Sequence, residues 1–353
     1  MKKFLPLLFA LILLIFPPVA FSASEEDALK AANVAIEKKY YDEAAKILKP
    51  LVESGNPEAL YAYGELSRSG LGMKKNLQQA AKYFQQAADK GEIRAQNALG
   101  VAYSSGEGVR RNYREAARWF KKAAEEGLAS AQYYLGYLYA HGRGLARSED
   151  AAIDWYGKAA NQGLADAQYS LGWTYLNSKT ANQSDTRAAR WFEKAAEQDH
   201  LKAINNLAYM YAEGRGFQQD YQKAIKLYEK AAERDYPQAL YNLGFMYEQG
   251  RGVEQNYAKA VELYRKAAEL NDPSAQYSLG LMYEQGSGVP ANLTEANRWY
   301  RLAAKNGDPE AKAALASQGA PAPKKNAPAK QERPKTKKPD KKKPAPPSRP
   351  VNP

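Results

Sequence analysis

A repeat of 36 residues runs through most of the chain without an insertion. Its clearest mark is a small residue that usually follows a leucine and recurs at Gly64, Gly100, Gly136, Gly172, Ala208, Gly244 and Gly280. Two further glycine columns keep the same step, one from Gly70 to Gly286 and one from Gly72 to Gly288. A fixed period of this size is typical of solenoids, in which each unit packs only against its neighbours.

Each unit is predicted to form two helices. In the first helix, Ala239, Leu243 and Tyr247 are spaced to lie on one face. The first helices of several units begin with a proline, which fits the first helical turn: Pro57, Pro237, Pro273 and Pro309. A good capping residue precedes each second helix: Asn76, Asn112, Ser148, Ser184, Asp220, Asn256 and Asn292.

The ends of the second helices carry a further signal. Each ends at a residue that tolerates a left-handed backbone: Gly55, Gly91, Gly127, Gly163, Asp199, Asp235, Asn271 or Gly307. Near their starts, Gln79, Glu115 and Glu295 follow the capping residue by three positions, which predicts capping boxes.

Seven full units fill residues 57–308, and the ends of the array need caps because a single helix pair cannot bury its apolar face alone. Residues 23–56 are predicted to form a divergent helix pair in the same register, and residues 309–318 a capping helix. In the fourth unit, Ser178 and Thr180 replace both loop glycines. We therefore expect that loop to differ from the others.

The unit reads A-x-x-x-L-G-x-x-Y-x-x-G-x-G-V, then K-A, then W/L-Y-x-K-A-A, as in residues 238–268. This pattern resembles the Sel-one-like repeat, a relative of the tetratricopeptide repeat, over about 290 residues. The resemblance implies an all-α fold, a right-handed α-solenoid of stacked helix-turn-helix repeats, and a role as a protein-interaction scaffold. Some cysteine-rich relatives bind peptidoglycan-like compounds or act as β-lactamases, but this chain has no cysteine.

The charge of the chain lies mostly outside the repeats. The formal net charge is +12, with 51 basic and 39 acidic residues; two of the basic residues lie in 1–23, and 11 basic and two acidic residues lie in 318–353. Residues 24–317 are therefore almost neutral, which argues against a nucleic-acid partner. Without cysteine and with only two histidines, the chain has few residues for nucleophilic or metal chemistry. We predict no enzyme activity, no metal and no cofactor.

Residues 1–22 have the layout of a secretory signal peptide, with two lysines, an apolar run and small residues near Ser22. We expect an exported protein that is periplasmic or secreted and has no transmembrane segment after cleavage. The alternative is a retained anchor, although the apolar run is short for a membrane span.

Residues 319–353 form a basic tail rich in proline and lysine, which we expect to be disordered. Its charge suits a polyanion such as peptidoglycan, an acidic glycan or lipid head groups, and the alternative is a solvated spacer. The lysines of this predicted polyanion-binding tail are Lys324, Lys325, Lys337, Lys338, Lys341, Lys342 and Lys343.

The resemblance places a binding groove on the first helices. The predicted groove residues stand three positions before the small residue of the L-G step or one position after it, four residues apart and on one helical face. They are Tyr61, Asn97, Tyr133, Tyr137, Tyr169, Trp173, Asn205, Tyr209, Tyr241, Phe245 and Tyr277. Tyrosine and tryptophan dominate interface hot spots. The alternative is that part of this stripe packs against the adjacent unit.

Charges near the predicted groove differ in sign along the chain, with Arg68 and Arg94 near its start and Glu213, Glu248 and Glu284 near its end. They either orient a ligand or only solvate the helices. We predict an exported adaptor that binds a protein or peptide in the groove, in the bacterial cell envelope. The alternatives are a protein that binds peptidoglycan or acidic polysaccharide, a β-lactamase-like enzyme and a secreted host-interaction factor.

Overall fold

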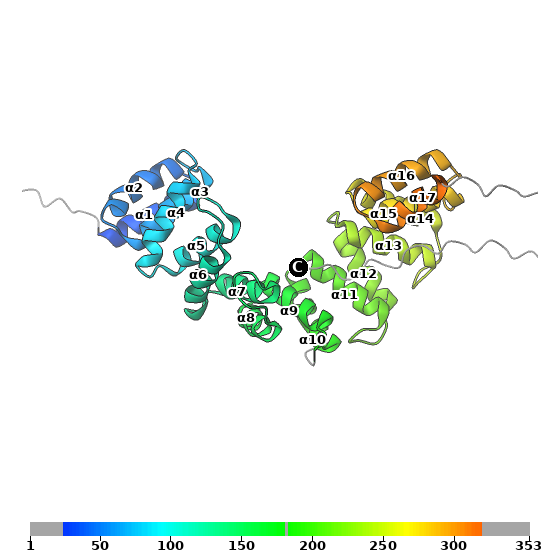
Figure 1. Ribbon diagram of the computed structural model, residues 1–353, viewed down its shortest axis with the longest axis horizontal. Helices are drawn as coiled ribbons and strands as arrows, with labels where there is room; N and C mark the ends of the chain where they lie inside the picture. Colours follow the sequence, from blue (N-terminus) through cyan, green and yellow to red (C-terminus); the bar gives the residue numbers. More distant parts are fainter. Residues whose placement is uncertain (1–23, 181–182, 320–353) are drawn as a thin grey trace, which may run out of the picture. The chain divides into compact units, whose positions relative to one another are not determined.

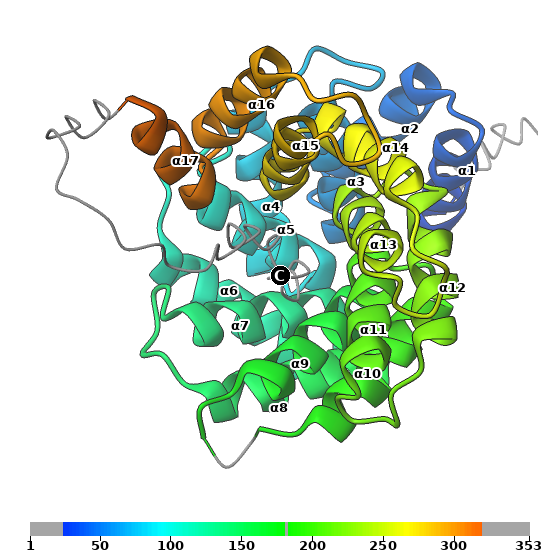
Figure 2. The same cartoon turned by 90° about the vertical axis from the view of Figure 1, so that its right-hand side faces the viewer.

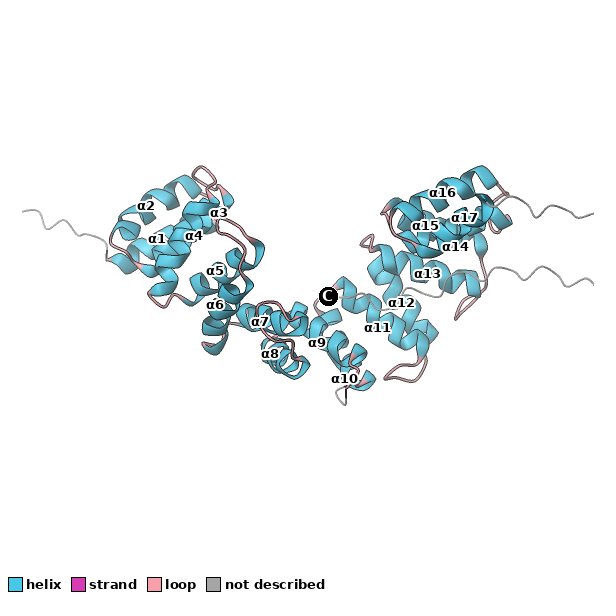
Figure 3. Ribbon diagram, viewed as in Figure 1, coloured by secondary structure: helices cyan, strands magenta, loops and turns pink. Residues whose placement is uncertain are grey.

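The computed structural model describes residues 24–180 and 183–319, and these residues contain 17 helices and no strand (Figure 3). The predicted signal peptide and the seven tail lysines lie outside the described residues. The helices are α1 (Glu25–Glu37), α2 (Tyr41–Glu53), α3 (Pro57–Ser69), α4 (Leu77–Asp89), α5 (Ile93–Ser105), α6 (Tyr113–Glu125), α7 (Ala129–His141), α8 (Glu149–Asn161), α9 (Ala165–Asn177), α10 (Asp185–Glu197), α11 (Leu201–Glu213), α12 (Tyr221–Ala232), α13 (Pro237–Gln249), α14 (Tyr257–Glu269), α15 (Pro273–Gln285), α16 (Leu293–Lys305) and α17 (Pro309–Gly319).

The chain divides into two compact units at Glu126 and Gly127. The first contains α1 to α6 and the second α7 to α17 (Figure 1). Within each unit every helix packs against the next one in the sequence, so the helix pairs follow one another in tandem. In the second unit α7, α9 and α11 succeed one another (Figure 2). The predicted fold class, an all-α solenoid of stacked helix pairs, is confirmed.

The small residue of the L-G step brings the two helices of one pair together. A Cβ atom added to any of these glycines would lie only 2.6–2.9 Å from the aromatic ring of the second helix. Real Cβ contacts are longer, so the ring sits where a side chain would stand. The pairs are Gly64 with Phe84, Gly100 with Phe120, Gly136 with Tyr156, Gly172 with Phe192, Gly244 with Tyr264, and Gly280 with Tyr300.

The second loop glycine, in the column from Gly72 to Gly288, allows close contact between consecutive helix pairs. A Cβ atom on Gly216 would lie 2.6 Å from the carbonyl oxygen of Asp185, at the start of the preceding second helix. Gly108 meets the backbone of Leu77 in the same way. Each such glycine also has a positive φ, a conformation in which a side chain is strained.

Both helix ends follow the sequence signals. The eight residues expected to end the second helices all have a positive φ, including Asp199, Asp235 and Asn271. The seven predicted caps of the second helices all accept a backbone N–H with their side chains, as when Asn256 accepts from Lys259 at 2.9 Å. These predictions are confirmed.

The predicted capping boxes are wrong. The backbone N–H of Asn112 already donates to the carbonyl oxygen of Tyr103 in the preceding helix, at 2.8 Å, so it is not available to Glu115. Glu115 instead pairs with Arg118 at 2.8 Å. The boxes predicted for Gln79 and Glu295 fail for the same reason. The backbone N–H groups of their N-cap residues, Asn76 and Asn292, also donate to the preceding helix.

In the N-terminal pair, α2 keeps the expected register and α1 departs from it. Residues of α2 stand 36 positions before their counterparts in α4, but α1 stands only 32 positions before α3. The reason is the connection at 38–40, which is four residues shorter than the connection at 70–76 in the next pair. Ala32 is therefore the counterpart of Gly64, and it is fully buried.

The contact between glycine and ring gives a test with a control inside the chain. We predict that Gly244→Ala lowers the free energy of unfolding by about 1–3 kcal/mol, because the Tyr264 ring is fully buried and cannot withdraw from the new methyl group. Ala208→Gly, the reverse change in the fifth repeat, should cost only about 1 kcal/mol, the difference in helix propensity. Urea unfolding followed by circular dichroism measures both. A larger loss for Ala208→Gly would contradict the packing account.

Candidate binding surface

The predicted groove residues fall into two groups by burial. The first group is partly exposed and consists of Tyr61, Asn97, Tyr133, Tyr137, Trp173 and Tyr209. The second group is buried and consists of Tyr169, Asn205, Tyr241, Phe245 and Tyr277. The expectation of an exposed position is therefore wrong for the second group.

Packing within each helix pair covers one side of the buried tyrosines, but Tyr61 and Tyr133 make the same contact and stay partly exposed, so the neighbouring repeat must supply the rest of the burial. Each buried tyrosine lies against the aromatic residue that contacts the L-G glycine, with ring centroids 5.7 Å apart for Tyr169 and Phe192 and 5.5 Å apart for Tyr241 and Tyr264. Such tilted aromatic pairs are favourable packing arrangements. The row three positions before the glycine therefore belongs mainly to the core of the second unit.

A row of polar contacts joins the same residues to the next repeat. Tyr169 forms a hydrogen bond with Asn206, 37 residues further on. Asn242 donates to Asn205 at 3.0 Å over the same separation. The sequence reasoning missed this row, although polar residues recur two positions before the small residue from Ser170 onward.

The open part of the surface lies over α7, α9 and α11. Three of its aromatic residues, Tyr137, Trp173 and Tyr209, follow the L-G step in three consecutive first helices; we call them the open aromatic row. Hollows lie at both ends of α9. One, of about 420 Å³, lies near the start of α9 and contains Asp166 and His200. The other, of about 370 Å³, lies beside Trp173 near its end.

The hollow beside Trp173 coincides with the loop that lacks glycines. Ser178 has an extended backbone, with φ −54° and ψ 141°, where other first helices end in a left-handed glycine. Its hydroxyl donates to Glu149 at 2.5 Å, and the hydroxyl of Thr180 donates to the same oxygen at 2.9 Å. The expected difference of this loop is confirmed. Hydrogen bonds to a carboxylate take the place of the glycine contact with the preceding helix.

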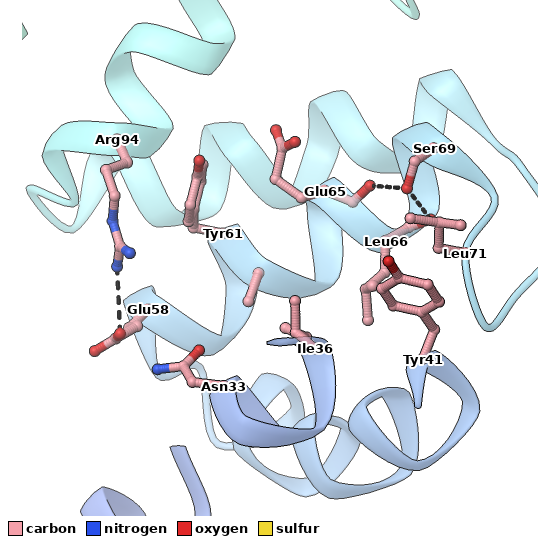
Figure 4. Close-up of a pocket in the computed structure, with 11 residues that line it drawn as sticks. Asn33, Ile36, Tyr41, Glu58, Tyr61, Glu65, Leu66, Ser69, Leu71 and Arg94 are labelled. Carbon is pink, nitrogen blue, oxygen red and sulfur yellow. Dashed lines mark hydrogen bonds and ion pairs between the residues drawn. The ribbon is translucent and has the colours of Figure 1, made fainter. Parts of the chain in front are cut away.

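A third hollow, of about 350 Å³, lies in the first unit between α1, α3 and α5 (Figure 4). Ile36 and Leu66 form part of its apolar lining. The guanidinium of Arg94 lies 4.8 Å from the centroid of the Tyr61 ring and pairs with Glu58 at 3.3 Å. The side chains of Arg94 and Glu58, which pair with each other, thus line one side of this hollow.

Comparison with known proteins assigns the repeat. A model of the Sel1 repeat family matches seven consecutive stretches: residues 57–92, 93–128, 129–164, 165–200, 201–236, 237–272 and 273–308. The chain belongs to the Sel1 repeat family. We number the repeats in this order. The predicted resemblance is confirmed.

Two solved structures are similar to this Sel1 repeat chain. A Sel1 repeat protein from Oxalobacter formigenes has a TM-score of 0.64 and 30% identity, covering 83% of this chain and 86% of its own. The second is c5321, a protective antigen of uropathogenic Escherichia coli with an SLR fold. It has a TM-score of 0.53 and 32% identity, covering 78% of this chain and 67% of its own. Among curated proteins, no significant match is found.

Most of the charges behind the predicted difference in sign already have partners within the Sel1 repeats, and Glu284 accepts a hydrogen bond from the Tyr300 hydroxyl at 2.8 Å. Glu248 is buried, and its Oε2 atom accepts a hydrogen bond from the Tyr264 hydroxyl at 2.6 Å. Burial raises the pKa of Glu248. The exposed charges form ion pairs, namely Arg68 with Glu65, Arg94 with Glu92, and Glu213 with Arg251.

The described residues offer little for chemistry. They contain no group of three or more His, Cys, Asp or Glu side chains that could hold a metal ion. In the same part of the chain, no helix combines the length and the apolar character that a membrane span requires. What the surface offers is aromatic area and hydrogen-bonding groups, which suit binding.

His200 begins α11 as its N-cap residue and lines the hollow near the start of α9. Its Nδ1 atom accepts from the Ala203 N–H at 3.2 Å, and its Nε2 atom lies 3.2 Å from Asp166 Oδ1. The ring also stacks on Tyr169, with centroids 4.7 Å apart. Because Nδ1 must accept, this geometry requires a neutral imidazole. Burial lowers the pKa of His200, against the opposing charge of Asp166.

We predict that His200 makes stability fall in acid. The pKa of His200 is lower in the folded state than the ordinary value of 6.5. Its contribution to the free energy of unfolding is therefore fully present above pH 6.5 and is lost as the pH falls through the folded-state pKa. His200→Asn keeps a capping oxygen without titrating. Relative to this variant, the natural chain should lose about 1 kcal/mol as the solution is acidified, the usual worth of an N-cap.

Urea unfolding of both chains at several pH values measures this difference. The matched control is His141→Asn, because His141 is exposed and caps no helix N-terminus. If His200→Asn shows the same pH dependence as the natural chain, the cap is not the titrating element.

Proposed function

We propose that this Sel1 repeat protein is an exported scaffold that holds a protein or peptide partner on the open aromatic row of its second unit. Sel1 repeat solenoids are generally non-catalytic scaffolds for protein interactions, and this supports the class of function. The observation that carries the proposal is the partial exposure of Tyr137, Trp173 and Tyr209 on consecutive first helices, with a hollow at each end of α9.

The energetics favour these three side chains over the rest of the predicted stripe. Tyrosine and tryptophan give large contact area at low entropic cost, and they lead among the residues whose loss weakens interfaces. The buried tyrosines cannot contribute, because a partner would have to displace the core to reach them. A partner that follows the row would contact three repeats, which increases its buried area.

Export is supported by the signal-like layout of residues 1–22. The similar E. coli protein is a protective antigen, a role in keeping with export from the cytoplasm. The basic tail at 319–353 supports a second role beside the groove, which is attachment to an anionic envelope polymer such as peptidoglycan. The tail carries most of the net charge of the chain, whereas the repeat region is nearly neutral.

The test compares partner capture by three forms of the full chain in its natural host. The groove variant is Tyr137→Ala, Trp173→Ala and Tyr209→Ala. The control is Tyr257→Ala with Leu293→Ala, which removes even more exposed apolar side chains, away from the row, from second helices. A third form lacks 320–353. Circular dichroism first checks that all are helical. We expect a discrete crosslinked protein with the natural chain, the control and the tailless form, and at least a tenfold loss with the groove variant.

Two outcomes would contradict the scaffold proposal. One is equal capture by the groove variant and its control, because the open aromatic row would then pack within the fold without binding the partner. The other is the absence of a protein partner together with sedimentation of the chain with the cell wall until the tail is removed. That binding should weaken steeply as salt rises, since it depends on exposed charges.

A further inference from the structure

Three repeats of the second unit place an arginine beside the aromatic residue that follows the L-G step. The guanidinium carbon of Arg143 lies 5.2 Å from the Tyr137 ring centroid, and that of Arg251 lies 5.2 Å from the Phe245 centroid. The pKa of Arg215 is raised by Asp185 and, to a smaller extent, by the nearby Tyr209 hydroxyl. Each arginine is the central residue of a Gly-Arg-Gly loop in its own repeat.

Two of these loop arginines, Arg215 and Arg251, also meet a carboxylate from the preceding repeat. Arg215 binds Asp185 through two nitrogens, at 2.9 and 2.7 Å, and Arg251 lies 3.1 Å from Glu213. A guanidinium between an aromatic side chain and a carboxylate gains both cation–π attraction and charge-assisted hydrogen bonds. Where the loop lacks arginine, the aromatic residue is usually absent too: Glu65, Val101 and Leu281 stand in those repeats.

The fourth repeat keeps the ring and the carboxylate but not the arginine. Trp173 stands 36 residues before Tyr209, and Glu149, the first residue of α8, stands 36 residues before Asp185, the first residue of α10. The loop position of the arginine is taken by Lys179, which is exposed. Among the described residues, no cation lies over the Trp173 ring and none forms an ion pair with Glu149.

The carboxylate of Glu149 is held in place by the altered loop. Its Oε1 atom accepts from the hydroxyls of Ser178 and Thr180. No hydrogen bond from the described residues reaches Oε2. Beside this group lies the hollow of about 370 Å³, which Trp173, Asn177 and Arg147 also line. The fourth repeat therefore combines a ring, an oriented carboxylate and space at the place where its neighbours hold a guanidinium.

We propose that this hollow binds an arginine side chain supplied by the protein partner. The inference rests on the proposed function and names the chemistry that the partner presents to the open aromatic row. Arginine is favoured over lysine because its planar group can lie on an indole and bind a carboxylate through two nitrogens. Repeats five and six hold such an arginine with residues of the chain itself: Arg215 binds Asp185 through two nitrogens, and Arg251 contacts both Phe245 and Glu213.

The test uses the peptide acetyl-Gly-Arg-Gly-amide, which copies the natural loop, and its citrulline analogue, which has the same shape without the charge. The readout is the indole N–H signal of Trp173 in NMR spectra of the full chain, assigned with Trp173→Phe. We expect the arginine peptide to shift this signal in a saturable way, and the citrulline peptide to bind at least tenfold more weakly. Glu149→Gln should weaken arginine binding at least fivefold.

Two variants separate this account from a general effect on the fold. Restoring the loop with Ser178→Gly, Lys179→Arg and Thr180→Gly should fill the hollow from within and abolish peptide binding while the helices remain intact. Arg147→Gln removes a like charge from the lining and should leave binding equal or tighter. Equal binding by the restored-loop variant would overturn the proposal.

The remaining outcomes distinguish this inference from the proposed function. If the arginine and citrulline peptides act alike, or if a cell-wall disaccharide shifts the Trp173 signal and the arginine peptide does not, the inference fails. The scaffold proposal stands in that case, provided that partner capture still requires the open aromatic row. If capture does not require the row but arginine binds at Trp173, the scaffold proposal fails and the hollow is an arginine site of another kind.

Discussion

The contact of a glycine with an aromatic ring is the constraint on which the solenoid depends. In six of the seven repeats the ring of the second helix occupies the space where a side chain of the first helix would stand. The ring then fixes how closely the two helices approach, and it provides the surface on which Tyr169, Tyr241 and Tyr277 pack. Ala208 shows the limit of this rule, because the fifth repeat keeps a fully buried methyl group at this position, in the same core as the buried Tyr228.

Contacts between repeats are built from different residues, and this separation allows the repeats to vary. The second loop glycine seats each loop on the start of the preceding second helix, as Gly216 does on Asp185. Polar side chains of the first helices add hydrogen bonds over 37 residues, such as that of Asn242 with Asn205. A repeat can change one of these connections without disturbing the contact that closes its own helix pair.

The period and the capping residues were sufficient to predict the helices, because each signal acts within a few residues. Asn256 and Asn271 mark a cap and a left-handed end wherever the helix packs. Exposure could not be predicted in the same way. Tyr133 and Tyr241 occupy the same column, yet only Tyr241 is buried. The outcome depends on neighbouring helices, which spacing within one helix does not describe. The capping boxes failed for the same reason, since Tyr103 in the preceding helix takes the N–H of Asn112.

Function in such a fold is therefore to be sought where a repeat departs from its neighbours without losing its packing. The fourth repeat keeps Gly172 against Phe192, so its helix pair closes normally. Its loop, however, lacks both glycines, and Thr180 meets the preceding helix through its hydroxyl group, at 2.9 Å from Glu149. Glu149 instead receives two hydroxyl groups, and the position of the loop arginine passes to the exposed Lys179. The hollow beside Trp173 lies at this altered loop and is lined by Glu149 and Ser178. Because the hydrogen bonds to the Glu149 carboxylate come from the residues that replace the two glycines, the departure from the pattern also orients that carboxylate.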